Sequence, residues 1–392
     1  QSVGGSRLFF WKKVYELHQN CRSRLVVVRL FLFNNKLAMP SYSLWGHTDL
    51  NIEIAEDVFA DETWHKERDI LFDHPQHGYF ESCHEGKKLH YRKNLPPEGT
   101  PIRAIIVWLH GIHGHSGIGM KCSSSDGRYT DMALRVRMMN AKGYAVYSHD
   151  QLGHGFSEGE RFYTPNSDWK IKRDDLVNFT RMAADEHPED IPLFLSGDSY
   201  GGCLAFHAAH VFQTEKPELA PKGFIGCTLN CPAFEGDLPI LPVVLFLRYC
   251  LAPFFPRWTP FFMPHPISPE RGWKEAEPRD YYTDQSQSHG LSKGGVPFCL
   301  GTASELLSAM EAARLLIPTF SVPFHINHGS DDYGVPLGGS QFCFKNSKTP
   351  TDKRELNIVA DGYHGLFSQL DAKETMQHEI DWIEKTINNT EI

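Results

Sequence analysis

The sequence predicts an α/β protein in which a doubly wound, mostly parallel sheet carries an inserted helical cap. Two observations lead to this fold class. From residue 78 onward, short apolar segments rich in β-branched residues alternate with segments of helical periodicity, which is typical of a parallel sheet with helices on both faces. A long segment, 233–317, then interrupts the alternation with a different composition, which indicates an insertion between two strands.

The predicted core begins with a β-hairpin and then follows the alternation. Tyr79–His84 and Lys88–Lys93 flank a turn at residues 85–87, which is a hairpin pattern. Ile102–Leu109 is almost entirely apolar, so we expect a strand that is buried on both faces. The other predicted elements are the helices Asp131–Ala141, Arg173–Glu186, Tyr200–Phe212 and Lys373–Ile387, and the strands Tyr144–Ser148, Ile191–Ser196, Gly223–Leu229, Pro323–Asn327 and Glu355–Val359.

The interrupting segment is rich in aromatic residues and prolines. Leu238–Pro264 contains prolines at positions 239, 242, 253, 256, 260 and 264. Because proline disrupts the interior of a helix, we expect short bent helices here. We interpret 233–317 as a cap inserted between the two parts of the core, 78–232 and 318–392; a peripheral subdomain with its own core is the alternative. The apolar composition favours a cap that faces lipid.

The first residues differ in charge from the rest of the chain. Residues 1–40 carry seven basic side chains and one acidic side chain, whereas the remaining 352 residues carry 32 basic and 47 acidic ones. We therefore expect a basic extension, 1–38, and an arm, 39–77, that precede the core. Three interpretations of 1–38 remain open: an appended sequence that precedes the first methionine, Met39, a targeting segment, or an arm that lies on a membrane surface.

Composition also restricts the compartment and the partners. Nine cysteines occur without a C-x-x-C pair, and an odd number without pairing predicts a reducing, cytoplasmic location. The net charge of −9 argues against binding to nucleic acid. The sequence indicates no oligomeric state.

Three G-x-S-x-G segments compete for the role of catalytic nucleophile, centred on Ser157, Ser199 and Ser292. A nucleophilic serine of this type stands on a tight turn between a buried strand and a helix. Only Ser199 has both neighbours, because IPLFLS precedes its motif and YGGCLAFHAAHVF follows it. We therefore predict that Ser199 is the nucleophile and that the other two are loop serines.

The acid and the base are expected after the serine in chain order. Asp331 and Asp332 directly follow one predicted strand, and His364 follows the next one. His364 is therefore the predicted base, and either aspartate could be the acid. His378 falls inside a predicted helix and is expected to be a surface residue.

An oxyanion hole requires two backbone N–H groups aimed at the reacting carbonyl oxygen. One is expected from Tyr200, which follows the nucleophile, and the other from Ile112 in the loop after the strand that ends at Leu109. Gly111 allows the turn that this loop needs. A metal site formed by His110, His113 and His115 is the competing interpretation, but no carboxylate or cysteine stands in register with them.

Five segments together resemble the monoacylglycerol lipase and lysophospholipase-like serine hydrolases of the α/β-hydrolase fold. They are VWLHGIHGHSG, YSHDQLGHGFSEGERF, PLFLSGDSYGG, HINHGSDDYGVP and GYHGLF, and the resemblance extends from about residue 78 to residue 388. It implies Ser199 as nucleophile, Asp332 as acid and His364 as base, with the N–H groups of Ile112 and Tyr200 as the oxyanion hole, and it implies no metal and no cofactor.

This chain departs from the family pattern at two places. Asp198 stands where these lipases usually have a histidine, which puts a negative charge beside the nucleophile, and Ile118–Gly127 is an insertion. The resemblance implies hydrolysis of lipid carboxylic esters, monoacylglycerols or lysophospholipids, through an acyl-enzyme, and the apolar cap suggests peripheral membrane contact. The alternatives are a soluble esterase of small aromatic or acyl-shikimate-type esters, an acyltransferase, and a non-catalytic receptor that retains the fold.

Overall fold

The chain divides into two units, residues 1–47 and residues 48–392, and the second unit holds the sheet. A computed structural model describes residues 46–48, 76–84, 86–117, 131–163, 169–263, 268–283 and 297–390. The predicted extension 1–38, nearly all of the predicted arm 39–77, the insertion Ile118–Gly127 and the loop serine Ser292 lie outside the described residues.

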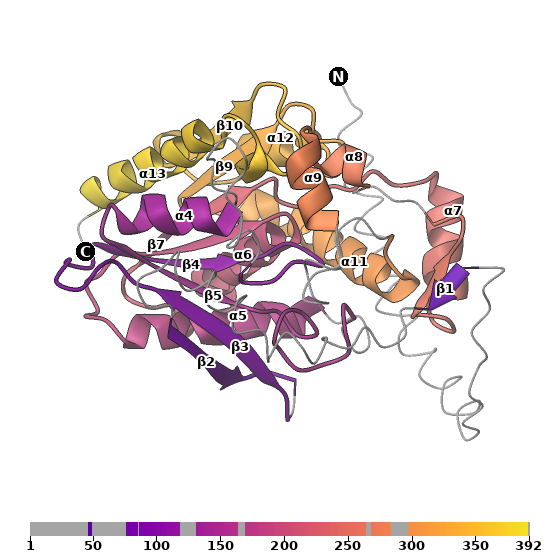
Figure 1. The fold of residues 1–392 in the computed structure, drawn as a ribbon, viewed down its shortest axis with the longest axis horizontal. Coiled ribbons are helices and arrows are strands. Elements are labelled where there is room, and N and C mark those ends of the chain that lie inside the picture. Colours follow the sequence, from indigo (N-terminus) through magenta and orange to yellow (C-terminus); the bar gives the residue numbers. More distant parts are fainter. Residues whose placement is uncertain are drawn as a thin grey trace. The chain divides into compact units, whose positions relative to one another are not determined.

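An eight-stranded sheet forms the centre of the second unit (Figure 1). Its strands lie in the order β10-β9-β7-β6-β4-β5-β3-β2. The pairs β2–β3 and β3–β5 are antiparallel and the other neighbouring strands are parallel, so the predicted mostly parallel sheet is confirmed. The strands are β2 (Gln76–Glu81), β3 (Lys88–Asn94), β4 (Ala104–Leu109), β5 (Tyr144–His149), β6 (Leu193–Asp198), β7 (Phe224–Asn230), β9 (Phe324–Gly329) and β10 (Arg354–Val359). Two three-residue strands, β1 (Gly46–Thr48) and β8 (Trp258–Pro260), do not belong to this sheet.

Helices cover both faces of the sheet (Figure 1). One face carries α4 (Asp131–Asn140) and α13 (Ala372–Asn388). The other face carries α5 (Trp169–Asp185), α6 (Tyr200–His210), α11 (Leu300–Leu316) and α12 (Leu337–Asn346). Short helical turns complete the core at Val211–Glu215, Pro217–Leu219, Ile317–Thr319, Thr351–Lys353 and Leu366–Ser368.

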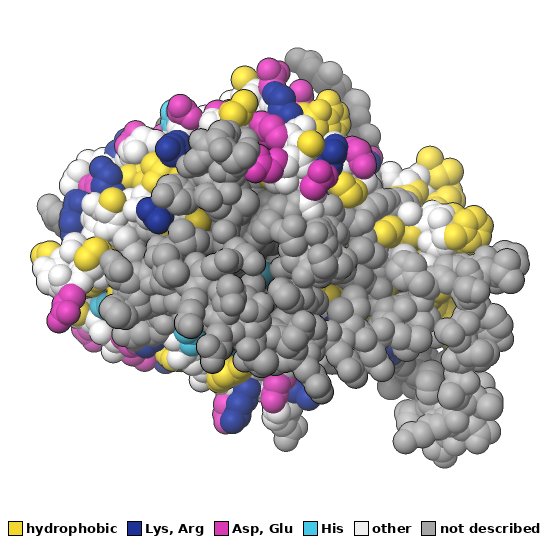
Figure 2. Space-filling model, viewed as in Figure 1, with side chains coloured by type: hydrophobic (Ala, Val, Ile, Leu, Met, Phe, Trp, Pro, Cys, Tyr) yellow, Lys and Arg dark blue, Asp and Glu magenta, His cyan; other side chains and the backbone are white. Residues whose placement is uncertain are grey.

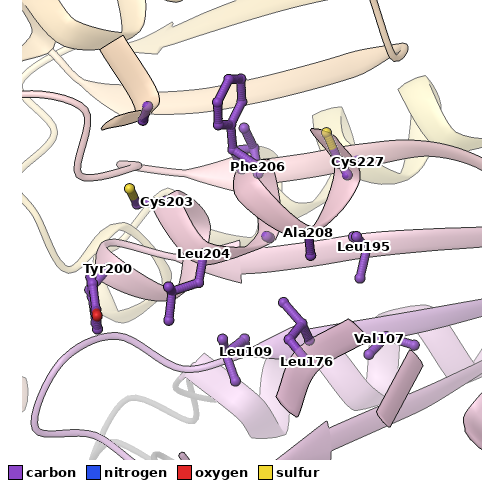
Figure 3. Packing of buried hydrophobic residues seen from close by; sticks show 14 of the residues in the cluster. Val107, Leu109, Leu176, Leu195, Tyr200, Cys203, Leu204, Phe206, Ala208 and Cys227 are labelled. Atoms are coloured by element: carbon purple, nitrogen blue, oxygen red, sulfur yellow. The ribbon is translucent and has the colours of Figure 1, made fainter. Parts of the chain in front are cut away.

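Strand β4 is buried on both sides, as its apolar sequence predicts. The side chains at 105, 107 and 109 belong to the core beneath α5 and α6, whereas those at 104, 106 and 108 belong to the core beneath α4 and α13. Figure 3 shows Val107 and Leu109 of this strand facing Leu204 of α6 and Leu176 of α5. Burying each such side chain stabilises the fold by roughly 1.5–3 kcal/mol, which explains why a charged residue is absent from β4.

The predicted hairpin is present, but its first strand lies three residues earlier than expected. The expected segment was Tyr79–His84, and the observed strand is Gln76–Glu81. The strand ends early because the next residues bind the carboxylate of Asp175 on α5. The hydroxyl of Ser82 donates to this carboxylate at 3.0 Å, and the N–H of Cys83 donates to it at 2.6 Å.

Between β7 and β9 the chain leaves the sheet. The prolines divide this segment into short pieces, as predicted: α7 (Leu241–Leu245), a turn of π-helix (Phe246–Leu251), α8 (Pro269–Gly272) and α9 (Ala276–Thr283). Helix α11 is longer, and it packs on α6, where Ala309 accepts a hydrogen bond from His207 Nε2 at 3.0 Å. The segment 233–317 therefore rests on the core through α11 and extends outward through its short helices.

Candidate active site

Ser199 stands at the abrupt crossing between β6 and α6. Its backbone has φ 55° and ψ −119°, a left-handed conformation that non-glycine residues rarely adopt. The glycines of the motif make this crossing feasible. A Cβ on Gly197 would lie 2.5 Å from the carbonyl oxygen of Gly201, and a Cβ on Gly201 would overlap the carbonyl oxygens of Leu109 and His110. The G-x-S-x-G spacing is therefore required here by steric contact between the helix and the neighbouring strands.

The second motif serine, Ser157, has a structural role. Its hydroxyl donates to the carbonyl oxygen of Asp150 at 2.7 Å and accepts the N–H of His90 at 2.9 Å. It lies in a loop with no strand running into it and no helix leaving it. His378, the other residue set aside on sequence grounds, is exposed on α13 as predicted.

Asp332 and His364 are joined in the structure. The turn after β9 carries Asp332 and the turn after β10 carries His364, and Nδ1 of the histidine lies 2.7 Å from Oδ2 of the aspartate. The other carboxylate oxygen, Oδ1, accepts the N–H groups of Gly334 and Val335 at 2.9 and 2.8 Å. The carboxylate of Asp331 instead accepts the hydroxyl of Ser330 at 3.3 Å. Geometry therefore favours Asp332 over its neighbour.

The pair shifts the protonation of both partners. Burial alone would raise the pKa of Asp332, but the charge and the hydrogen bond of His364 hold it below its ordinary value. Burial alone would lower the pKa of His364, yet Asp332, with a smaller contribution from Asp198, raises it above 6.5. Because the ionised carboxylate accepts the Nδ1 proton, Nε2 is left to accept a proton.

Ser199 and His364 line one cavity, of about 840 Å³, which also includes Asp198 and Trp273. In the described part of the chain no hydrogen bond joins the serine hydroxyl to His364, so the two side chains must approach before a proton can be transferred. Gly111 forms part of the same wall. A Cβ at this position would lie only 3.2 Å from the Cβ of Ser199, so glycine lets the loop come close to the nucleophile.

The loop that carries Ile112 is fixed by hydrogen bonds to Asp150, the first residue of the sequence DQLGHG at 150–155. Oδ1 of Asp150 accepts the N–H of Ser116 at 2.6 Å, and Oδ2 accepts the N–H of Phe156 at 2.8 Å. The two loops are therefore tied to one buried carboxylate. Ile112 and Tyr200 both line a second cavity, which also includes Ser199. Their role as an oxyanion hole remains a prediction.

The three histidines of the alternative metal interpretation have local structural contacts. Nε2 of His110 accepts the N–H of Gln151 at 3.0 Å, and Nδ1 of His115 accepts the N–H of Gly117 at 3.2 Å. The ring of His113 packs edge-on against Phe162 and Phe298. Burial lowers the pKa of His110 to about 4 and that of His115 to about 3, so both are neutral.

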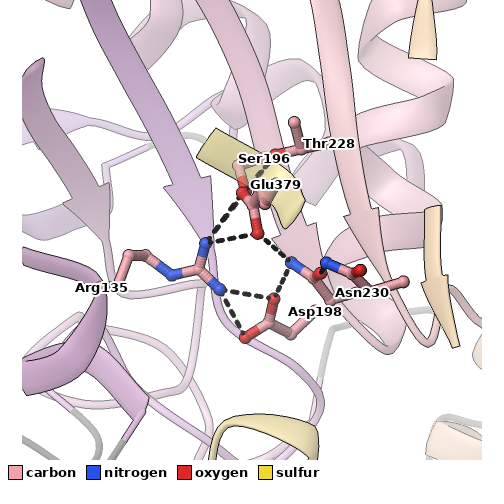
Figure 4. A network of polar contacts seen from close by, with 7 residues as sticks. Arg135, Ser196, Asp198, Thr228, Asn230 and Glu379 are labelled. Atoms are coloured by element: carbon pink, nitrogen blue, oxygen red, sulfur yellow. Dashed lines mark hydrogen bonds and ion pairs between the residues drawn. The ribbon is translucent and has the colours of Figure 1, made fainter. Parts of the chain in front are cut away.

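A buried polar network beneath the nucleophile was not expected from the sequence (Figure 4). Arg135 Nη2 lies 3.1 Å from Asp198, and Arg135 Nη1 lies 3.2 Å from Glu379. Asn230 donates to Asp198 at 3.0 Å and Thr228 donates to Glu379 at 2.6 Å. A signal was present: Glu379 falls on the apolar face of α13, and a buried carboxylate requires a partner.

Residues 100–371, more than half of the chain, match the Hydrolase_4 family, which is described as serine aminopeptidase S33. The chain belongs to this family. A rat monoglyceride lipase is 28% identical over 299 residues, which cover 74% of this chain and 85% of that enzyme. An uncharacterised abhydrolase domain-containing protein from Dictyostelium discoideum is 26% identical over 293 residues; the match covers 75% of this chain but only 27% of that protein's length.

Solved structures agree on the fold. A soluble variant of the monoglyceride lipase from Saccharomyces cerevisiae superposes with a TM-score of 0.60 at 18% identity, and the match covers 80% of this chain and 96% of the other. The predicted α/β-hydrolase fold is therefore confirmed. The predicted class, a carboxylic ester hydrolase similar to the monoacylglycerol lipases, is confirmed by the family and by the relatives.

The Asp332–His364 contact generates a test of the two adjacent aspartates. We expect Asp332→Asn to lower kcat by about 10³–10⁴-fold, because the amide no longer fixes the imidazole tautomer or stabilises the imidazolium. Asp331→Asn is the matched control, because the described hydrogen bond of the Asp331 carboxylate is to the neighbouring Ser330. The kcat of this variant should stay within about twofold of the wild type. Steady-state ester hydrolysis measures both; equal losses would contradict the assignment.

The raised pKa of His364 predicts the pH dependence. Only the neutral imidazole accepts the serine proton, so kcat/KM should fall as the pH decreases through an apparent pKa above 6.5. Asp332→Asn removes the negative charge that raises the pKa of His364, so the fall in the residual kcat/KM should occur at lower pH in this variant. Profiles of kcat/KM against pH for the wild type and the variant check the sign, and an unchanged or higher midpoint in the variant would contradict it.

Proposed function

We propose that this protein hydrolyses carboxylic esters of lipids, monoacylglycerols or lysophospholipids, through an acyl-enzyme formed on Ser199. The observation that carries the proposal is an apolar cavity of about 950 Å³ that begins at Ser199. The relatives from rat and human are named monoglyceride lipases, which supports the same substrate class.

The apolar cavity, which we call the acyl-side cavity, is formed largely by segment 233–317. Leu238, Val244, Leu247, Leu300, Leu307 and Met310 line it. The cavity of about 840 Å³ that contains His364, which we call the alcohol-side cavity, shares Ile112 and Ser199 with it. An ester bound with its carbonyl at Ser199 can therefore direct its acyl chain into one cavity and its alcohol into the other. We propose on this basis that 233–317 is the cap.

The proposed mechanism uses side chains, backbone N–H groups and water. His364 removes the proton of Ser199 as the hydroxyl oxygen attacks the ester carbonyl, and the N–H groups of Ile112 and Tyr200 bind the oxyanion. The imidazolium, stabilised by Asp332, then protonates the leaving alcohol as the C–O bond breaks. A water molecule, deprotonated by His364, attacks the acyl-enzyme. The bond between the acyl carbon and the Ser199 oxygen then breaks, His364 returns the proton to that oxygen, and the fatty acid is released.

The outer surface of the same segment is apolar, and we propose that it contacts membranes peripherally. Figure 2 shows hydrophobic side chains gathered over α7. Ile240 and Phe261 are 73% and 70% exposed, and Phe246 and Phe254 are each 52% exposed. Exposed apolar surface of this kind marks a protein or membrane contact. Among the described helices, none has both the length and the apolar composition to cross a bilayer.

Substrate comparison tests the proposed function. We expect kcat/KM for a long-chain monoacylglycerol to exceed that for a short-chain aryl ester by at least about tenfold, because only the long chain fills the acyl-side cavity. Hydrolysis measured in matched detergent micelles gives this ratio. A preference for the short ester would instead support the soluble esterase.

Active-site variants provide the control for this comparison. Ser199→Ala should abolish both hydrolysis and labelling by a fluorophosphonate, since the attacking hydroxyl is removed. Ser157→Ala removes the serine of an equivalent motif and should retain labelling in the folded protein. A folded wild type that neither hydrolyses esters nor reacts with the probe would favour the receptor interpretation.

Membrane contact predicts a loss of liposome binding. The double variant Ile240→Ser, Phe261→Ser should reduce the fraction that sediments with phosphatidylcholine liposomes severalfold, because it removes two large apolar contacts from the bilayer. Leu370→Ser is the matched control, since Leu370 is equally exposed, at 70%, but follows β10 in the core. Equal sedimentation of all three proteins would contradict the proposal.

A further inference from the structure

The alcohol-side cavity has an acidic wall. Asp198 lines it, and the side chain of this residue is 20% exposed, whereas that of its partner Arg135 is fully buried behind it. The carboxylate is therefore the member of this ion pair that a bound alcohol would meet. Among the described lining residues of this cavity, none is a lysine or an arginine.

The charges around this wall do not cancel. Arg135 is shared between two carboxylates, Asp198 at 3.1 Å and Glu379 at 3.2 Å. Its single positive charge therefore balances only one of them. Asp332, which lies 2.7 Å from Nδ1 of the lining residue His364, adds a further buried negative charge near the cavity. When Asp198 and Glu379 are both ionised and His364 is neutral, the groups around the alcohol-side cavity carry an excess of negative charge.

We propose that Asp198 is a specificity-determining residue, whose carboxylate, held by Arg135 beside Glu379, makes the alcohol-side cavity reject esters of anionic alcohols and accept those of uncharged alcohols. This inference rests on the proposed function, since it concerns the leaving group of the same reaction. It separates the two lipid classes of that proposal: a glycerol leaving group is favoured over a glycerol that carries a phosphate.

The size of the effect follows from Coulomb's law. Two unit negative charges about 8 Å apart, at an effective dielectric constant of about 20, disfavour binding by about 30-fold. A phosphate would also lose its hydration in this cavity without gaining a cationic side chain from the described lining. A glycerol hydroxyl, in contrast, can donate a hydrogen bond to a carboxylate.

The decisive measurement uses two esters that differ only in charge, 1-oleoylglycerol and 1-oleoylglycerol 3-phosphate, in the same neutral micelles. Burial raises the pKa of Asp198, against the opposing effect of Arg135, so the ratio is measured at several pH values and should increase as the carboxylate ionises. We expect the wild type to prefer the uncharged ester by at least about 30-fold in kcat/KM. Asp198→Asn, which keeps the side-chain shape, should reduce this ratio by about tenfold or more.

Two further variants separate charge from structure. Glu379→Gln removes the charge one layer behind the wall and should reduce the ratio in the same direction but by less. Asp331→Asn removes a charge outside the cavity lining and should leave the ratio unchanged. If Asp198→Asn lowers the rates of both esters and keeps their ratio, the residue only supports the fold and the inference is wrong.

A second readout does not depend on turnover. Fluorophosphonates whose second arm is uncharged or carries a carboxylate should label Ser199 of the wild type at rates that differ by at least about tenfold, and Asp198→Asn should reduce this difference. Equal labelling rates in the wild type would overturn the inference. Selective labelling without hydrolysis of either lipid ester would support the acidic wall and overturn the proposed lipase activity, so the two failures are distinguishable.

Discussion

The tight crossing at Ser199 is the constraint on which the rest of the site depends. A residue with φ 55° is retained only when its surroundings leave the chain no alternative. Here the N–H of Ser199 donates to the backbone carbonyl oxygen of Asn230 at 2.8 Å. The carbonyl oxygen of Ser199 accepts the N–H groups of Cys203 and Ala233 at 3.1 and 2.9 Å. The strand β6 and the helix α6 are themselves held in place by a core that is buried on both faces of the sheet.

Buried charges surround this crossing, and each is paired by a segment distant in the sequence. Asp150 joins the loop that carries Ile112 to β3, because its carboxylate contacts both Ser116, at 2.6 Å, and His90, at 2.9 Å. Lys172 and the hydroxyl of Tyr200 both contact Glu305, at 3.1 and 2.6 Å. Such pairs add little net stability compared with apolar packing, but removing one partner is costly. Their consequence here is positional, because each pair joins elements that are distant in the sequence around Ser199.

In the proposed function, the two cavities divide the recognition of an ester between different physical effects. The acyl-side cavity is lined mostly by apolar side chains, from the short helices of segment 233–317 and from α11, so it can recognise chain length through burial of surface. The alcohol-side cavity contains the titratable groups, so it can discriminate charge. Asp198 belongs both to the G-x-S-x-G turn and to this second cavity, and it is one of the two places at which the chain departs from the family pattern.

Much of the fold and part of the site could be predicted from the sequence, because the evidence for them is local. Continuous apolar strands and helical periodicity are properties of neighbouring residues, and the strand and helix that flank Ser199 distinguish it from Ser157 without any knowledge of packing. Chain order alone left Asp331 and Asp332 open, and only the family resemblance pointed to Asp332. The tertiary structure shows which carboxylate contacts His364, because adjacent side chains on a turn point in different directions. Likewise, Arg135 and Glu379 are 244 residues apart in the chain. The sequence around each of them indicates only that a charged residue on a buried helix face needs a partner. Which partner it meets is decided by the packing of α4 and α13 against the same face of the sheet.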